Sequence, residues 1–157
     1  MLLNILTELY ERDLAKLKSE IEQYSNSSDL WLIDGEIANS AGNLTLHIVG
    51  NLNHFLGGVL GGSGYVRDRD REFSDKDVPR EDLVSSIDET RTIIRATFEK
   101  LSEEDLAAEY PIQVFGEPIK TGYFLVHLAT HLNYHLGQVN YHRRLLAKQF
   151  KGESIPG

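Results

Sequence analysis

The stretch that decides the fold runs from Thr121 to Phe150 and reads TGYFLVHLATHLNYHLGQVNYHRRLLAKQF. Its apolar residues recur every three or four positions, as they do on one face of an α-helix. Three histidines, His127, His131 and His135, follow the same spacing. The stretch therefore predicts one long amphipathic helix that carries a row of imidazoles.

Three segments upstream show the same periodicity, over residues 3–24, 38–60 and about 79–101. Four such segments with little predicted strand favour an all-α protein, a four-helix bundle. Five glycines close the second segment, and a polar stretch over residues 62–77 follows it. A connection of this length can cross a bundle from end to end, whereas a short loop would leave consecutive helices antiparallel.

The chain is 157 residues long, the size of one domain. We expect residues 1–150 to form the bundle and residues 151–157 to be a C-terminal tail. Within the bundle, Pro111 to Lys120 predicts a short extended pair around Gly116, a small hairpin.

Composition excludes several classes of function. The chain has no cysteine, which rules out disulfide scaffolds, thiolate metal sites and cysteine nucleophiles. Sixteen basic against twenty-four acidic residues give a net charge of −8, the wrong sign for a nucleic-acid binder. The N-terminus has no basic leader, and no apolar run is long enough to cross a membrane. A cytoplasmic protein is the expectation.

The histidine spacing is that of a metal site. Residues four apart on a helix project from the same side, so His131 and His135 can direct nitrogens at one ion. His127 cannot join both, because it lies about 12 Å along the axis from His135. A third ligand must then come from elsewhere, and the second segment offers His47 and His54. The alternative interpretation is ordinary histidines, solvated or hydrogen-bonded in the core, and the same applies to His142.

Several metal and hydrolase motifs are absent. Leu132 follows His131 where a zincin has glutamate, and no glutamate precedes a histidine by three positions as in di-iron bundles. The glycine cluster contains no phosphate-binding loop, and Gly61-Gly-Ser-Gly-Tyr65 lacks the last glycine of a nucleophile elbow. Three neutral imidazoles would leave a coordination position open, which is the catalytic rather than the structural arrangement of zinc.

The chain resembles the DinB family, the DinB/YfiT-like metalloenzymes. That family's last helix typically carries His-x-x-x-His followed by Arg-Gly-Gln, and this chain has His131-Leu-Asn-Tyr-His135-Leu136-Gly137-Gln138. Its second helix carries a histidine in a Leu-x-x-His-(Ile/Leu) context, which Leu44-Thr-Leu-His47-Ile48 matches. The likeness covers nearly the whole chain. Leu136 departs from the pattern, because arginine is common there.

The resemblance implies a bundle of up-down-down-up topology, which agrees with the long connection over residues 62–77. It also implies one divalent ion, zinc or nickel first with iron or manganese as alternatives, held by His47, His131 and His135. The sequence itself favours His47 over His54, because the apolar run around His47 looks buried and an unpaired imidazole there would be costly. A homodimer is a further implication.

Three functions remain open. The first is a metal-dependent S-transferase that joins a low-molecular-weight thiol to an electrophilic small molecule, as in characterised relatives of the family. The second is a hydrolase that uses metal-activated water and the same three histidines. The third is a stress-associated metal-binding dimer without turnover. An open coordination position beside a pocket favours the enzymes, and a fourth protein ligand favours the third function.

Overall fold

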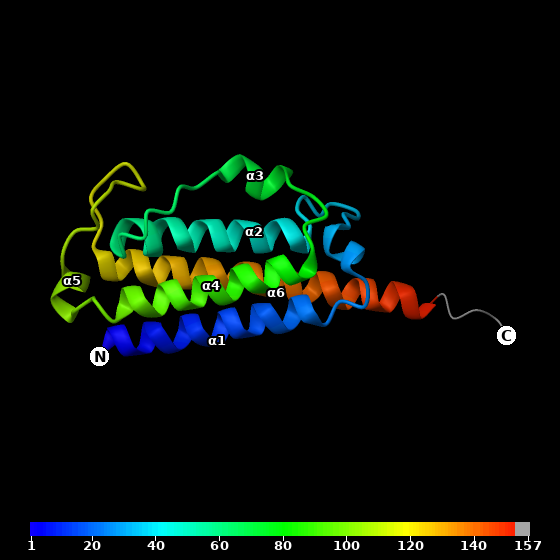
Figure 1. Cartoon of the computed structure of the whole chain (residues 1–157), viewed down its shortest axis with the longest axis horizontal. Helices are drawn as coiled ribbons and strands as arrows, with labels where there is room; N and C mark the ends of the chain where they lie inside the picture. The colour runs from blue at the N-terminus through cyan, green and yellow to red at the C-terminus, as the bar shows by residue number, and fades with distance from the viewer. Residues whose placement is uncertain (153–157) are drawn as a thin grey trace.

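The computed structural model describes residues 1–152, with side chains as far as Leu146. These residues are helical and contain no strand, so the predicted all-α class is confirmed. Four long helices lie side by side (Figure 1). They are α1 (Leu2–Glu22), α2 (Ala41–Leu52), α4 (Arg80–Phe98) and α6 (Thr121–Gly152).

The colours of Figure 1 give the directions of the long helices. Helices α1 and α6 run away from the left-hand end, whereas α2 and α4 run toward it. Each of α1 and α2 contacts both α4 and α6. The second and third long helices are therefore parallel, and the chain must return along the molecule between them.

One continuous hydrophobic core lies between the long helices. The apolar stripe of α1 supplies Leu6, Tyr10, Leu14, Leu17 and Ile21, all almost completely buried. The stripe is buried because residues three and four apart share one face of the helix. The hydroxyl of Tyr10 donates a 2.7 Å hydrogen bond to the carbonyl of Leu125, so this buried polar atom is satisfied.

The predicted helix over residues 38–60 begins later and changes its winding. Ser40 caps α2, because its hydroxyl accepts a hydrogen bond from the Asn43 amide at 3.2 Å, so the helix begins at Ala41. From Asn53 the helix continues as η2 (Asn53–Leu60), which is wound as a π-helix. A β-carbon at Gly57 would lie 2.8 Å from the Ile93 side chain, so a glycine lets η2 approach α4 closely.

The polar connection over residues 62–77 contains a helix that its sequence did not predict. Helix α3 (Arg69–Ser74) is capped by Asp68, whose carboxylate accepts from the Arg71 amide at 3.2 Å. It lies along α2 in Figure 1. The Asn43 side chain holds it there by donating to the carbonyls of Glu72 and Asp75 at 3.0 and 2.8 Å.

The remaining segments are short. They are η1 (Ser27–Trp31), a single 3-10 turn, and α5 (Glu103–Ala107). The predicted hairpin over residues 111–120 is reduced to one isolated bridge between Glu109 and Lys120. Helix α6 continues to Gly152, and residues 153–157 of the predicted tail lie outside the described residues. In the described part of the chain, no helix has the length and apolarity needed to cross a membrane.

Candidate metal centre

Three imidazoles from two helices meet between these helices, with His47 buried and the other two half-buried. His47 comes from α2, and His131 and His135 come from α6. The Nε2 atom of His131 lies 3.2 Å from Nε2 of His47 and 3.0 Å from Nε2 of His135. Within the described residues, these three form the group whose ligand atoms all lie within 4.8 Å of one another. We call this group the histidine triad.

The spacing of these nitrogens fits one metal ion. Two nitrogens bound tetrahedrally at ~2.0–2.1 Å from one zinc ion lie about 3.3 Å from each other. Burial, and then the neighbouring His135, lowers the pKa of His131 to about 4. Burial also lowers the pKa of His135. Since only the neutral ring can donate a lone pair to a metal, these two rings could bind a metal ion near neutral pH.

A carboxylate from the crossover fixes the orientation of His47. Glu72 of α3 is buried, with 6% of its surface exposed, and its Oε1 lies 2.9 Å from Nδ1 of His47. A proton on Nδ1 donates to Glu72 and leaves the Nε2 lone pair facing the other two histidines. Such a carboxylate–histidine pair behind a metal ligand sets the tautomer and the orientation of the ring.

Arg67 in turn holds Glu72. Its Nε and Nη2 atoms donate to the two carboxylate oxygens at 2.8 Å each, a bidentate pair. Burial by itself would raise the pKa of Glu72, but the hydrogen bonds from Arg67 and His47 outweigh it and the pKa lies below its ordinary value. Glu72 is therefore ionised at neutral pH and can accept from both partners.

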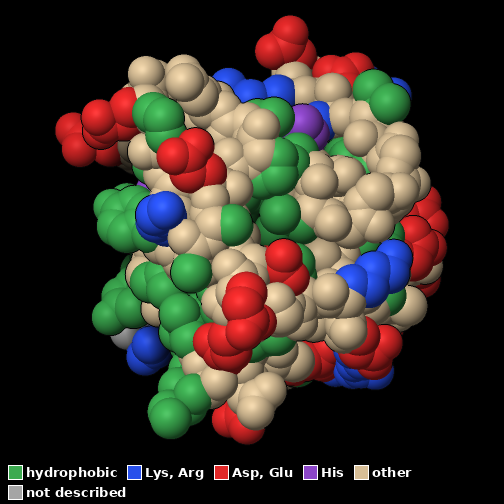
Figure 2. Space-filling view, turned by 90° about the vertical axis from the view of Figure 1, so that its left-hand side faces the viewer, with side chains coloured by type: hydrophobic (Ala, Val, Ile, Leu, Met, Phe, Trp, Pro, Cys, Tyr) green, Lys and Arg blue, Asp and Glu red, His purple; other side chains and the backbone are tan. Residues whose placement is uncertain are grey.

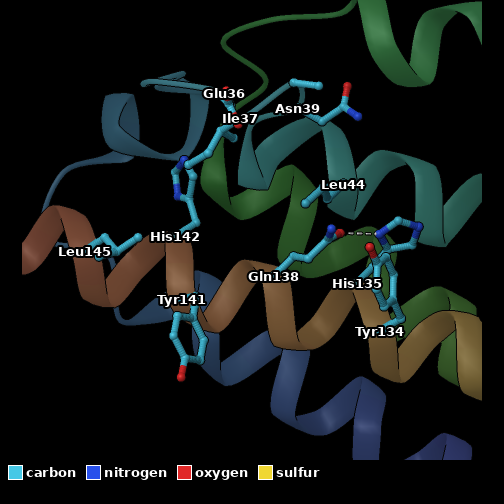
Figure 3. Close-up of a pocket in the computed structure, with 11 residues that line it drawn as sticks. Glu36, Ile37, Asn39, Leu44, Tyr134, His135, Gln138, Tyr141, His142 and Leu145 are labelled. Atoms are coloured by element: carbon cyan, nitrogen blue, oxygen red, sulfur yellow. Dashed lines mark hydrogen bonds between the residues drawn. The ribbon is translucent and has the colours of Figure 1, made fainter.

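His135 has its own orienting partner on α6. Its Nδ1 lies 2.7 Å from the side-chain oxygen of Gln138, the contact drawn as a dashed line in Figure 3. The amide oxygen can only accept, so Nδ1 carries the proton and Nε2 is left free to bind. Two of the three triad rings are thus held by a hydrogen bond at the nitrogen that faces away from the centre.

A cleft opens beside the triad and has His135 in its wall (Figure 3). Its volume is about 690 Å³, within the range of small-molecule sites. One wall is α6, and the other is the segment that leads into α2 together with the first turn of that helix. The lining residues are Glu36, Ile37, Ala38, Asn39, Leu44, Tyr134, His135, Gln138, Tyr141, His142 and Leu145.

The other three histidines lie outside the triad. His142 is buried, and its two nitrogens lie 2.7 Å from the Tyr24 hydroxyl and 2.9 Å from the carbonyl of Leu32. It is a hydrogen-bonded core histidine, one of the alternatives the sequence left open. His54 lies in η2 with its ring against Phe55.

His127 is exposed at the surface of α6, and its ring contacts two aromatic side chains, Phe115 and Phe124. The three regularly spaced imidazoles of this helix therefore have different surroundings. His131 and His135 belong to the triad, whereas His127 does not.

Sequence reasoning missed Glu72 and Arg67. Their only signal was the run of alternating charges in the polar connection, which is typical of a solvated surface. Leu136, where the family commonly has arginine, is buried in the core. A cation does lie beside the triad, because Nη2 of Arg67 is 3.5 Å from Nδ1 of His47.

Comparison with known proteins agrees with this fold. A family model described as a protein of unknown function, DUF1572, matches residues 2–157. The crystal structure of a DinB-like protein from Bacillus cereus superposes with a TM-score of 0.67 at 20% identity, covering 97% of this chain and 94% of that one. No protein with a curated description matches. Because the family model spans nearly the whole sequence, the chain belongs to the DinB-like family DUF1572.

Proposed function

We propose that this protein is a metal-dependent enzyme whose ion is held by His47, His131 and His135 on an up-down-down-up four-helix bundle. The observation that carries the proposal is the convergence of three Nε2 atoms next to a cleft. Three imidazoles suit zinc or nickel first, and iron or manganese as alternatives.

The ligand count supports an enzyme over a protein that only stores or senses metal. In the described part of the chain, no fourth histidine or carboxylate joins the triad. The nearby carboxylate, Glu72, is engaged by His47 and Arg67 on the far side of the His47 ring. Three protein ligands leave a position for a reacting molecule, which is typical of catalytic zinc sites.

The reaction we favour is transfer of a low-molecular-weight thiol to an electrophilic small molecule. His47, His131 and His135 would hold the metal ion, whose chemical contribution would be to lower the pKa of the thiol substrate. The chain has no cysteine, so the sulfur must come from a separate molecule. The residues of the cleft would hold the electrophile beside His135 and exclude water from it.

Hydrolysis with water as the nucleophile is the alternative, and it uses the same residues. It needs the same open position and the same neutral ligands, so the geometry of the triad favours neither reaction. The two reactions differ in their dependence on added thiol.

We also propose a homodimer. A groove of about 410 Å³ between α1 and α6 is lined mainly by apolar side chains, among them the exposed Leu2, Ile5 and Val126, and its polar lining includes the ion pair of Arg12 and Asp13. Figure 2 shows hydrophobic side chains gathered along one edge of the end of the molecule where α1 begins. Exposed apolar surface of this kind marks interaction sites.

Elemental analysis of the purified, untagged protein tests the metal site. We expect about one divalent ion per chain. The His131→Ala, His135→Ala double variant should lose that ion while keeping its helical circular dichroism, because the apolar core lies outside the triad. Full occupancy in the double variant would disprove the site.

Activity is then screened with the metal-loaded protein. A low-molecular-weight thiol and a chlorodinitrobenzene electrophile report S-transfer, and a nitrophenyl ester without thiol reports hydrolysis. Turnover that requires both metal and thiol supports the transferase. Ester cleavage alone supports the hydrolase, and metal binding with neither reaction supports the non-enzymatic metal-binding dimer.

A further inference from the structure

The charge of the side chains that line the cleft beside the triad is one-sided, because one is acidic and none is basic. Its single charged side chain, histidines aside, is the carboxylate of Glu36. Neither lysine nor arginine contributes to it, in a chain whose net charge is −8. A negatively charged molecule would therefore leave water without gaining a cationic partner, which is costly in a partly enclosed site.

Apart from the two histidines and the uncharged amides of Asn39 and Gln138, the rest of the lining is apolar or aromatic. Ile37, Leu44 and Leu145 supply aliphatic surface from both walls. Tyr134 and Tyr141 lie seven residues apart on α6, so they project from nearly the same face of that helix. Both residues are about two thirds exposed, at 66% and 64%. Flat aromatic faces of this kind bind other rings by stacking and bind cations through the ring quadrupole.

The cleft is elongated along α6, and its two ends differ in their residues. His135 and Leu145 are ten residues apart on α6, so the lining extends about 15 Å along this helix. In Figure 3, Glu36 and Ile37 lie above His142, away from His135. Both nitrogens of His142 are engaged, one with the Tyr24 hydroxyl and the other with the Leu32 carbonyl. A bound molecule thus meets the triad at one end and Glu36 toward the other.

From these observations we propose that the cleft binds an aromatic molecule that is uncharged or cationic and that anionic substrates are excluded. Its rings lie against Tyr134 and Tyr141, its reacting end faces His135, and any ammonium group faces Glu36. The claim that this molecule is the electrophile of the reaction rests on the proposed function. The claim that it binds in the cleft does not.

One cation lies near the mouth of the cleft. The guanidinium of Arg144 sits 5.4 Å from the centre of the Tyr141 ring, although Arg144 does not line the cleft. It covers one face of that ring. The charge that a bound molecule meets inside the cleft remains that of Glu36.

Three probes with the same aromatic body and different charge test the proposal. They are 1-naphthylmethanol, 1-naphthylmethylamine and 1-naphthoate, titrated by calorimetry into metal-free protein so that no carboxylate can bind a metal ion. We expect 1-naphthoate to bind about three-fold or more weakly than the other two, the size expected for partly solvated charge interactions. Equal affinities for the three probes would overturn the proposal.

Matched variants locate the binding. Tyr141→Ala should weaken all three probes, whereas Tyr123→Ala, which removes a ring that is 65% exposed on the same helix outside the cleft, should weaken none. Glu36→Lys should make 1-naphthoate the tightest probe, and Glu117→Lys, at an exposed glutamate outside the cleft, should not. If Tyr123→Ala behaves like Tyr141→Ala, and Glu117→Lys behaves like Glu36→Lys, the probes bind elsewhere and the proposal fails.

A zinc titration of the same protein separates this proposal from the proposed function. Zinc binding at the triad without probe binding would disprove the cleft assignment and leave the metal centre intact. Probe binding in the expected order, in a protein that binds neither zinc nor nickel, iron or manganese, would support the cleft and disprove the enzyme. With both, NMR line broadening of bound 1-naphthylmethylamine by Co²⁺ should place it beside the triad. Sharp lines with bound Co²⁺ would overturn the placement.

Discussion

The Glu72 side chain can reach His47 because residue 50 is a glycine, which has no β-carbon in its way. A β-carbon at Gly50 would lie 2.0 Å from Oε2 of Glu72, much closer than two such atoms can approach. The carboxylate cannot simply turn away, because it is buried and Arg67 and His47 hold both of its oxygens. Gly50 stands one turn after His47 on α2, so both lie on the face of that helix that α3 covers.

Gly50→Ala should lower the free energy of unfolding by about 1–2 kcal/mol, the typical cost of overpacking a filled site. Gly137→Ala is the matched control, because a β-carbon at Gly137, also within a helix, would meet nothing within 4 Å. It should stabilise the protein by about 0.5–1 kcal/mol through helix propensity. Chemical denaturation measures both. Equal stabilisation by the two changes would show that Glu72 does not need this space.

Glu72→Gln should weaken metal binding by about 10–100-fold, the usual effect of changing a residue behind a ligand. A carboxamide keeps the shape of the side chain but loses its negative charge, and its NH2 group cannot accept from Nε of Arg67 as Oε2 does. Asp70→Asn removes an exposed charge from the same short helix and is the control. A competition titration against a chromophoric chelator gives the affinities, and an unchanged value for Glu72→Gln would rule out its orienting role.

The helix that carries His47 changes its winding before it reaches His54. Seven residues of straight α-helix would put the two rings on similar faces about 10.5 Å apart along the axis. His54 lies in the π-helical η2, where its ring packs on Phe55, and it is not part of the triad. Of the two, only His47 lies within contact of His131.

His47→Ala should therefore lower the metal affinity by orders of magnitude, because it removes one of three ligands. His54→Ala should leave the metal in place. Metal-to-protein ratios after dialysis against a weak chelator distinguish the two variants. The reverse result would mean that the ion is bound two turns further along this helix than we propose.

At the scale of the whole molecule, the lowered pKa of His131 makes stability depend on pH. The ring has a pKa of about 4 in the folded chain, whereas an unfolded histidine titrates near ~6.5. Between these values the unfolded chain binds more protons, so the metal-free protein should lose stability as the pH falls from about 6.5 toward about 4. The lowered pKa of His135 acts in the same direction.

Denaturation of the metal-free protein at pH 7 and at pH 5 measures this effect. His131→Ala should show a smaller difference between the two conditions, because the titrating ring is gone. If the variant is as sensitive to pH as the native chain, the acid sensitivity arises elsewhere.

The proposed dimer is tested by substitutions at matched surface positions. Ile5 and Ile33 are similarly exposed, at 49% and 53%, but only Ile5 lines the groove between α1 and α6. Light scattering should show a dimer for the native chain and for Ile33→Glu, and a monomer for Ile5→Glu, because a buried unpaired carboxylate is costly in an apolar interface. A native monomer at high micromolar concentration would remove the proposal.

The sequence by itself determined the helices and the local half of the candidate site. A repeat of three and four residues is a property of a single helix, so it located α1, α4 and α6 without reference to any partner. The spacing of His131 and His135 is equally local, because the helix alone brings their nitrogens together. Capping and winding shifted the limits of the second helix by only a few residues and changed its last two turns.

Only the tertiary structure decided what surrounds the triad. Glu72 and Arg67 lie in a polar stretch whose composition matches any solvated connection, and their role depends on α3 folding back along α2. The cleft likewise arises where the segment before α2 passes over α6. A helical repeat is set by bonds between near neighbours along the chain. The position of a carboxylate behind His47 depends instead on contacts between segments that no local pattern connects.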